Sequence, residues 1–117
     1  MDPEQLLITV AQAQTEGHGR HVAVRGELDV DTSPRLLGEI HRLMAEGATL
    51  IVLDLTGASF IDSSGLRVLV HGGEALKASG GDLLIEGMSP AVEKLLELTG
   101  MLERRPDWSS ERRDREA

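Results

Sequence analysis

The sequence predicts one α/β domain with a mixed β-sheet covered by helices, in the order β-β-α-β-α-β-α. Its 117 residues are 40% apolar and 27% charged, which fits a single globular domain with one modest core. Segments with strand-like apolar patterns alternate with segments of helical apolar spacing. Residues 49–55 form a near-continuous apolar run, which is typical of a central parallel strand buried on both faces.

The first two strands are expected at residues 6–10 and 21–25. Between them, residues 16–19 carry two glycines that permit a turn. Because the link is short, the two strands are expected to pair as an antiparallel hairpin. Residues 26–29 are expected to form a loop after the hairpin.

The first helix is expected to begin near Thr32 or Ser33. Ser33 can cap the free amide groups of a helix start, and Pro34 suits the first helical position. Gly47 lies where glycine commonly ends a helix. With strand 49–55 behind it, this helix completes a β-α-β unit, whose crossover is almost always right-handed.

The second helix is expected to begin at residues 62–64 and to end at residues 80–81. Gly72 and Gly73 lie inside it, and each glycine costs about 1 kcal/mol relative to alanine. Close packing against a neighbouring element is the favoured explanation for them. A weak point that permits motion is the alternative.

The last strand is expected at residues 82–86. A serine–proline pair at residues 89–90 then opens the third helix by the same capping logic, and this helix is expected to stop at residues 99–100. Residues 103–117 contain only one large apolar side chain. We therefore expect residues 1–102 to form the domain and residues 103–117 to form a charged, flexible tail.

The charge balance excludes several classes of partner. The chain has 20 acidic and 12 basic residues, a formal net charge of -8 and only 2% aromatic residues. Such a chain repels nucleic acid and anionic membrane surfaces, and we expect it to bind neither. The excess of acidic residues lies within residues 1–102, so a partner with a basic face is expected. No membrane-length apolar run and no signal peptide are present, which predicts a cytoplasmic protein.

The residues do not form a recognisable catalytic set. The chain has no cysteine, and its histidines, at positions 18, 21, 41 and 71, lack the spacing of metal ligands. The Gly-x-Ser-x-Gly turn, the Walker phosphate loop and the dinucleotide fingerprint are all absent. We expect no catalytic residue, no bound metal and no cofactor.

Residues 60–66, Phe-Ile-Asp-Ser-Ser-Gly-Leu, follow the buried strand and open a helix. Open α/β sheets place their sites at the carboxyl ends of parallel strands, and the start of a helix attracts anions. A serine at this position is exposed beside the positive end of a helix. The sequence Asp-Ser-Ser-Gly is also an ordinary helix cap, and the residues alone leave both interpretations open.

At this segment the chain resembles the STAS family, and within it the small bacterial anti-sigma factor antagonists. The similarity extends over roughly residues 6–102, in which several matching segments follow one another in the same order. The matching segments are Gly26-Glu27-Leu28-Asp29, Asp54-Leu55, Phe60 to Leu66, Gly80-Gly81, and Ser89-Pro90 with Leu98 to Leu102.

The resemblance implies a cycle of partner switching. The unmodified protein would bind an anti-sigma factor and so release a sigma factor. That anti-sigma factor would also be a serine kinase, which phosphorylates the serine directly after the aspartate, here Ser63, and thereby blocks binding. A phosphoserine phosphatase would reverse the modification. Asp29, Asp62, Ser64 and Gly65 would lie at the partner surface.

The chain departs from its relatives at Arg67, where many of them have a small residue. Arg67 lies four positions after Ser63, so the two side chains can share a helix face. It is counted among the partner-binding residues, with two alternatives for its role: pairing with phosphoserine, or an ordinary solvated arginine. A second departure is residues 106–117, which lack the apolar stripe of the last helix found in many relatives.

Two other functions are retained as alternatives. Within the same family, the chain could be a STAS accessory subunit that binds the ATPase of a membrane transporter. Outside it, the chain could be a small enzyme or nucleotide binder that uses the crevice beside Ser63. Kinase-dependent labelling of Ser63 would favour the antagonist, and ATP turnover by the isolated chain would favour the enzyme.

Overall fold

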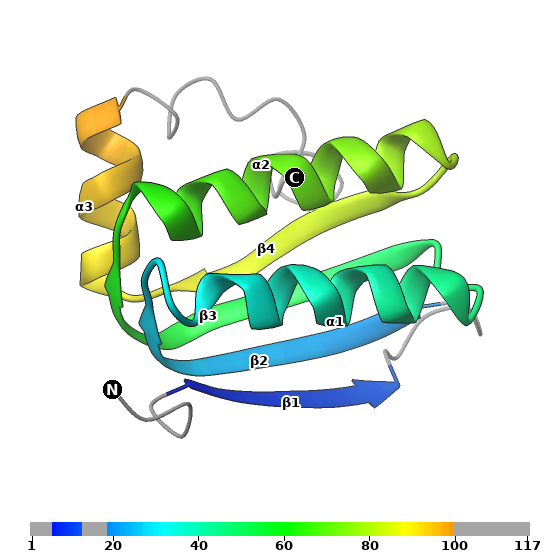
Figure 1. Cartoon of the computed structure of the whole chain (residues 1–117), viewed down its shortest axis with the longest axis horizontal. Helices are drawn as coiled ribbons and strands as arrows, with labels where there is room; N and C mark the ends of the chain where they lie inside the picture. Colours follow the sequence, from blue (N-terminus) through cyan, green and yellow to red (C-terminus); the bar gives the residue numbers. More distant parts are fainter. Residues whose placement is uncertain (1–5, 13–18, 100–117) are drawn as a thin grey trace, which may run out of the picture.

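The computed structural model describes residues 6–12 and 19–99, and the elements in this part of the chain follow the predicted order (Figure 1). The elements are β1 (Leu6–Gln12), β2 (Gly19–Leu28), α1 (Ser33–Ala45), β3 (Leu50–Ile61), α2 (Ser63–Ala78), β4 (Asp82–Met88) and α3 (Pro90–Thr99). The predicted α/β class with a mixed sheet is therefore confirmed. The predicted tail at residues 103–117 lies outside the described residues.

The four strands form one sheet in the order β1-β2-β3-β4. The pair β1 and β2 is antiparallel, as the short link between them predicts, and the pairs β2–β3 and β3–β4 are parallel. Because the three parallel strands end at the same edge of the sheet, the helices that follow them begin there. Figure 1 shows α1, α2 and α3 all starting at this carboxyl end.

Helices α1 and α2 lie side by side on one face of the sheet, and α3 stands at its carboxyl end (Figure 1). Between the helices and the sheet lies a core of fully buried aliphatic side chains, which includes Leu36, Ile40, Leu53, Leu69 and Leu83. None of the helices in the described part of the chain is long and apolar enough to cross a membrane.

Gly72 lies where α2 packs against α1. A Cβ atom at this position would lie 3.0 Å from Cδ1 of Ile40, which is closer than an ordinary van der Waals contact. Gly72 and Gly73 are both buried. The contact supports close packing, rather than a hinge, as the reason for glycine at position 72.

All four strands extend beyond their predicted ends, β2 and β3 by the most. The expected loop at residues 26–29 is wrong for its first three residues, because β2 continues to Leu28, and β3 continues to Ile61 rather than ending at position 55. The register between these strands shifts twice, and Gly26 adopts a φ of 113°, a conformation that glycine accepts without strain. A prediction based on regular alternation of apolar and polar residues ends the strand at such irregularities. The extension carries the carboxyl edge of the sheet directly to α2.

The starts of α1 and α3 differ, although both carry a serine–proline pair. Ser33 does not cap α1 as expected, because Thr32 occupies the cap position and no side-chain cap is formed. Ser89 does cap α3: its hydroxyl oxygen accepts the amide of Val92 at 3.2 Å and donates to the carbonyl oxygen of Ala58 at 2.5 Å. At the end of α1, Gly47 has a φ of 101°, which confirms its predicted role.

Candidate functional site

Asp62 is the single residue between β3 and α2, and it fixes how the helix begins. Its extended backbone ends the strand, and its carboxylate Oδ1 accepts the amides of Ser64 at 2.9 Å and Gly65 at 3.3 Å. Its carbonyl oxygen accepts the amide of Leu66 at 3.0 Å, which is the first hydrogen bond of the helix. The first turn of α2 therefore has a defined geometry from its first residue onward.

Ser63 is the first residue of α2, and its side chain is exposed. Its hydroxyl makes no hydrogen bond to any described residue. Ser64, by contrast, is half-buried, and its amide is held by Asp62. Of the two neighbouring hydroxyls, Ser63 is the one that an approaching enzyme can reach.

Gly65 allows the first turn of α2 to press against the end of β2. A Cβ atom at this position would lie 2.8 Å from Cγ1 of Ile61 and 3.0 Å from both Cβ and the carbonyl oxygen of Leu28. The amide of Asp62 also donates to that carbonyl oxygen at 3.2 Å. Gly65 is buried, so the expectation that it lies at the partner surface is wrong. It instead lets the turn that carries Ser63 pack closely against Ile61 and Leu28.

Asp29 organises the loop that leads from β2 to α1. Its Oδ1 accepts the amides of Asp31 at 3.0 Å and Thr32 at 2.9 Å. The Thr32 hydroxyl donates to the carbonyl oxygen of Glu27 at 2.5 Å and accepts the amide of Asp29 at 3.0 Å. Hydrogen bonding from the Thr32 backbone lowers the pKa of the Asp29 carboxyl from its ordinary value of 3.8. One carboxylate oxygen of Asp29 is thus committed to its own loop.

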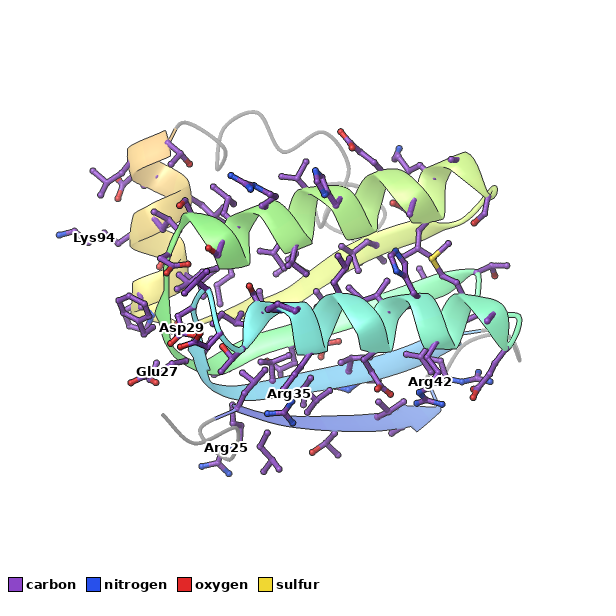
Figure 2. The ribbon with its side chains drawn as sticks, in the orientation of Figure 1. Arg25, Glu27, Asp29, Arg35, Arg42 and Lys94 are labelled. Atoms are coloured by element: carbon purple, nitrogen blue, oxygen red, sulfur yellow. The ribbon has the colours of Figure 1, made fainter. Side chains whose placement is uncertain are left out.

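Two exposed apolar side chains accompany this site. Val30, in the loop held by Asp29, is 67% exposed, and Phe60, near the end of β3, is 46% exposed. Neither residue is predicted from the sequence to be a contact residue. The position of Val30 between two aspartates is the sequence feature that could have indicated its exposure. Figure 2 shows the carboxylates of Glu27 and Asp29 at the same end of the sheet. An acidic surface with isolated apolar side chains fits a protein partner with a basic face.

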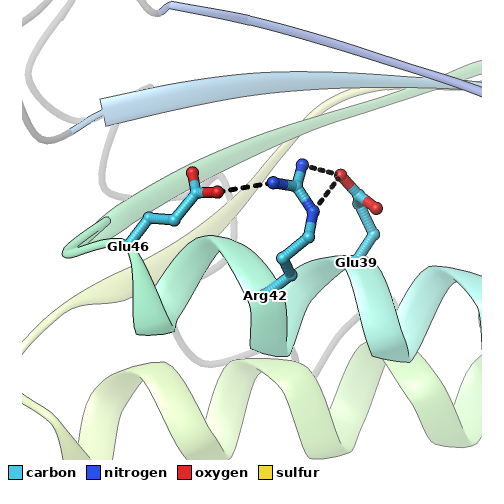
Figure 3. Close-up of polar contacts among 3 residues, drawn as sticks. All are labelled: Glu39, Arg42 and Glu46. Atoms are coloured by element: carbon cyan, nitrogen blue, oxygen red, sulfur yellow. Dashed lines mark hydrogen bonds and ion pairs between the residues drawn. The ribbon is translucent and has the colours of Figure 1, made fainter.

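Arg67 lies one helical turn after Ser63 and is exposed. Its guanidinium forms no ion pair or hydrogen bond with any described residue. Arg42 of α1 offers a contrast: its guanidinium is held between two carboxylates, with Nη1 2.6 Å from Oε2 of Glu46 and Nε 3.1 Å from Oε2 of Glu39 (Figure 3). Arg67 is therefore available for a ligand, whereas Arg42 is not.

The structure brings the expected residues together at one end of the sheet. Ser63, Ser64 and Gly65 form the first turn of α2, Asp62 caps it, and Asp29 holds the adjacent loop. Within residues 6–12 and 19–99, no three His, Asp or Glu side chains are grouped so that they could hold a metal ion. The group available for chemistry is the exposed hydroxyl of Ser63, on the first turn of α2.

The chain is similar in sequence to known proteins. The model of the STAS domain matches residues 12–111. An anti-sigma-B factor antagonist of Staphylococcus aureus (strain NCTC 8325) is 33% identical over 90 residues, which cover 77% of this chain and 83% of that protein.

Solved structures show the same fold. The crystal structure of an anti-sigma factor antagonist from Mycobacterium paratuberculosis superposes with a TM-score of 0.74 at 27% identity, over 92% of this chain and 88% of the other. The anti-sigma factor antagonist SpoIIAA in its unphosphorylated form gives a TM-score of 0.68 at 25% identity, over 80% and 81% of the two chains. The family match and the curated relative together show that the chain belongs to the STAS domain family.

Proposed function

We propose that the chain is an anti-sigma factor antagonist. In its unmodified form it binds an anti-sigma factor and so releases a sigma factor, and phosphorylation of Ser63 blocks this binding. The observation that carries the proposal is the exposed, unpartnered hydroxyl of Ser63 on a rigid helix start, in a family whose matched members are named as such antagonists.

The phosphorylation step requires little of this chain. The proposed partner is an anti-sigma factor with serine kinase activity, which holds ATP and the catalytic base. Ser63 Oγ attacks the γ-phosphorus, an Oγ–P bond forms, the bond to the leaving ADP breaks, and the hydroxyl proton passes to the base of the kinase. A separate phosphoserine phosphatase hydrolyses the ester. The chain acts in the cytoplasm by binding and needs neither a cofactor nor a catalytic residue of its own.

The proposed contact surface surrounds Ser63. Val30 and Phe60 supply exposed apolar area, and Ser64 lies at the edge of the contact. Asp29 and Asp62 each use one carboxylate oxygen to hold the loop and the helix start. Their second oxygens have no partner among the described residues and can accept hydrogen bonds from a basic partner.

Phosphorylation blocks binding because of charge and hydration. The phosphate adds about -1.5 to -2 charges, which must lose their water when the two proteins meet. In the free protein the same group remains in solvent, since Ser63 is exposed. Binding is therefore lost while the fold is kept, and we expect little change in the backbone.

Binding measurements with substituted chains test the proposal. Candidate partners are the anti-sigma factors with a kinase-like ATPase fold encoded in the same genome, and affinity is measured by isothermal titration calorimetry. Ser63→Ala is expected to bind as the native chain does, whereas Ser63→Asp is expected to bind at least about 10-fold more weakly. Ser33→Asp is unsuitable as a control because Ser33 is buried, so the exposed Ser79→Asp serves instead.

Equal binding by Ser63→Ala and Ser63→Asp would contradict the mechanism. Binding to a transporter ATPase, with no binding to any anti-sigma factor, would favour a STAS accessory subunit instead. ATP hydrolysis by the isolated chain would favour an enzyme. The named relatives favour the antagonist over both.

A further inference from the structure

The amides at the start of α2 are already used in the unmodified protein. The carboxylate of Asp62 accepts the amides of Ser64 and Gly65, and its carbonyl oxygen accepts that of Leu66. These amides are the donors that a helix start ordinarily offers to an anion. A phosphate on Ser63 therefore has only the amide of Ser63 itself available, unless it displaces Asp62.

The surroundings of Ser63 carry negative charge as well. Asp62 precedes it directly, and Glu27 and Asp29 lie at the same end of the sheet (Figure 2). Because the negative charge of Asp62 already offsets the helix dipole, the dipole can do little to stabilise a second anion. A phosphate with about -1.5 to -2 charges needs a counter-charge from a side chain.

The other cations labelled in Figure 2 do not supply that counter-charge. Lys94 points outward from α3, and Arg25 and Arg35 extend toward the β1 side of the sheet. Arg35 is also occupied, because its Nη1 donates to the carbonyl oxygen of Leu6 at 2.9 Å. Arg42 is held by two glutamates.

Arg67 has the position on the helix and the unpaired guanidinium that are required to bind a phosphate on Ser63. It lies four residues after Ser63 on the same helix, a spacing that puts Cβ atoms about 5–6 Å apart. Side chains on a helix generally lean toward its N-terminus, which is the direction of Ser63 from Arg67. An anion that precedes a cation by four residues is the favourable order, and a guanidinium can grip a phosphate with two hydrogen bonds.

We propose that Arg67 binds the phosphate of phosphoserine at position 63 and stabilises the modified form of the protein. This inference rests on the proposed function, since it requires that Ser63 be modified. In the unmodified chain Arg67 remains solvated, and on phosphorylation it becomes the partner of the new charge. The switch then has a built-in counter-ion that favours the modified state.

The test uses the full chain with phosphoserine installed at position 63 during translation, so that it needs no kinase. A pH titration followed by ³¹P NMR gives the second pKa of the phosphate. With Arg67 present, this pKa is expected to be about 0.15–0.4 lower than in Arg67→Gln, which corresponds to one pair of this spacing. Arg67→Lys, which keeps the charge, is expected to retain most of the difference. In about 1 M salt the difference is expected to shrink.

Lys77→Gln is the matched control, because it removes one positive charge from the far end of the same helix. It is expected to leave the phosphate pKa unchanged. Equal pKa values in the native chain and Arg67→Gln, or the same change in Lys77→Gln, would overturn the proposal. Either result would leave the proposed function intact, since that function is judged by binding. Conversely, an unphosphorylated Ser63 in cells would refute the proposed function whatever the phosphate pKa.

Discussion

Helices α1 and α2 both begin with a serine, yet the two serines have opposite surroundings. Ser33 is only 3% exposed, whereas Ser63 is exposed and unpartnered. Before α1 the chain makes a loop, and the amide of Ser33 donates to the carbonyl oxygen of Asp29 at 2.8 Å. Before α2 the strand β3 leads into the helix through Asp62 alone. The residue type at a helix start therefore does not decide whether its side chain is accessible. The path of the preceding chain decides it.

The two helix starts also expose different groups at this end of the sheet. The loop before α1, tied together by Asp29 and Thr32, holds Val30 out into solvent. The start of α2, supported by Gly65 against Leu28, presents Ser63. In the proposed mechanism, one region offers apolar contact and the other offers the hydroxyl that the kinase modifies. Substitutions in each region separate these contributions.

The largest effect is expected at Gly65, which sets the distance between α2 and β2. In Gly65→Ala the new methyl group meets Ile61 and the backbone of Leu28 at 3.0 Å or less, so the variant should lose about 2–3 kcal/mol of unfolding free energy. Urea denaturation measures the loss. Gly38→Ala in α1 is the control: it meets no atom within 4 Å and should gain about 0.5–1 kcal/mol. Equal stability of the two variants would show that the close approach at Gly65 does not matter.

A smaller effect is expected at the apolar contacts. Phe60→Ala should weaken binding to the anti-sigma factor by about 1–2 kcal/mol, which is roughly 5- to 30-fold, because exposed aromatic side chains at an interface often dominate its affinity. Val30→Ala should cost less than about 1 kcal/mol, since it removes only two methyl groups. Leu7→Ala serves as the control, because Leu7 is 56% exposed on the edge strand β1, which does not pair with β3. An equal loss in Leu7→Ala would mean that the interface lies elsewhere.

The smallest effect concerns pH and the loop before α1. Because hydrogen bonds lower the pKa of Asp29 in the folded state, its charge adds stability at pH values above 3.8, and this contribution is lost as the pH falls through the lowered value. Asp29→Asn should therefore lose less stability than the native chain on acidification below 3.8. Denaturation followed across that range measures the difference. Asp31→Asn removes the same charge without a side-chain hydrogen bond among the described residues, and an identical response in both variants would rule out the Asp29 contribution.

Much of this molecule follows from local sequence patterns. The apolar run of β3, the helical spacing in α1 and α2 and the turn glycine Gly47 predict the element order and the position of the helix that carries Ser63. The ends of β2 and β3 do not follow, because they pair through register shifts that only the assembled sheet determines. The same holds for Ser33, whose burial depends on the Asp29–Thr32 loop.

Within the site, the sequence identifies Ser63 and its aspartate cap but not their electrostatic relation. That Asp62 takes up the helix amides depends on hydrogen-bond geometry, and this observation supports the proposal that Arg67 binds the phosphate. Similarly, an alternating or helical pattern cannot show that Val30 and Phe60 stay exposed beside Ser63.

Tandem mass spectrometry of the chain, after incubation with the proposed anti-sigma factor and ATP, shows directly whether Ser63 is the residue that is phosphorylated. We predict a single phosphate on Ser63, absent from Ser63→Ala and unaffected in Ser64→Ala, with Ser33 unmodified in every sample. A phosphate on Ser64 or Ser33 in the native chain, or none at all while the partner remains bound and active, would contradict it.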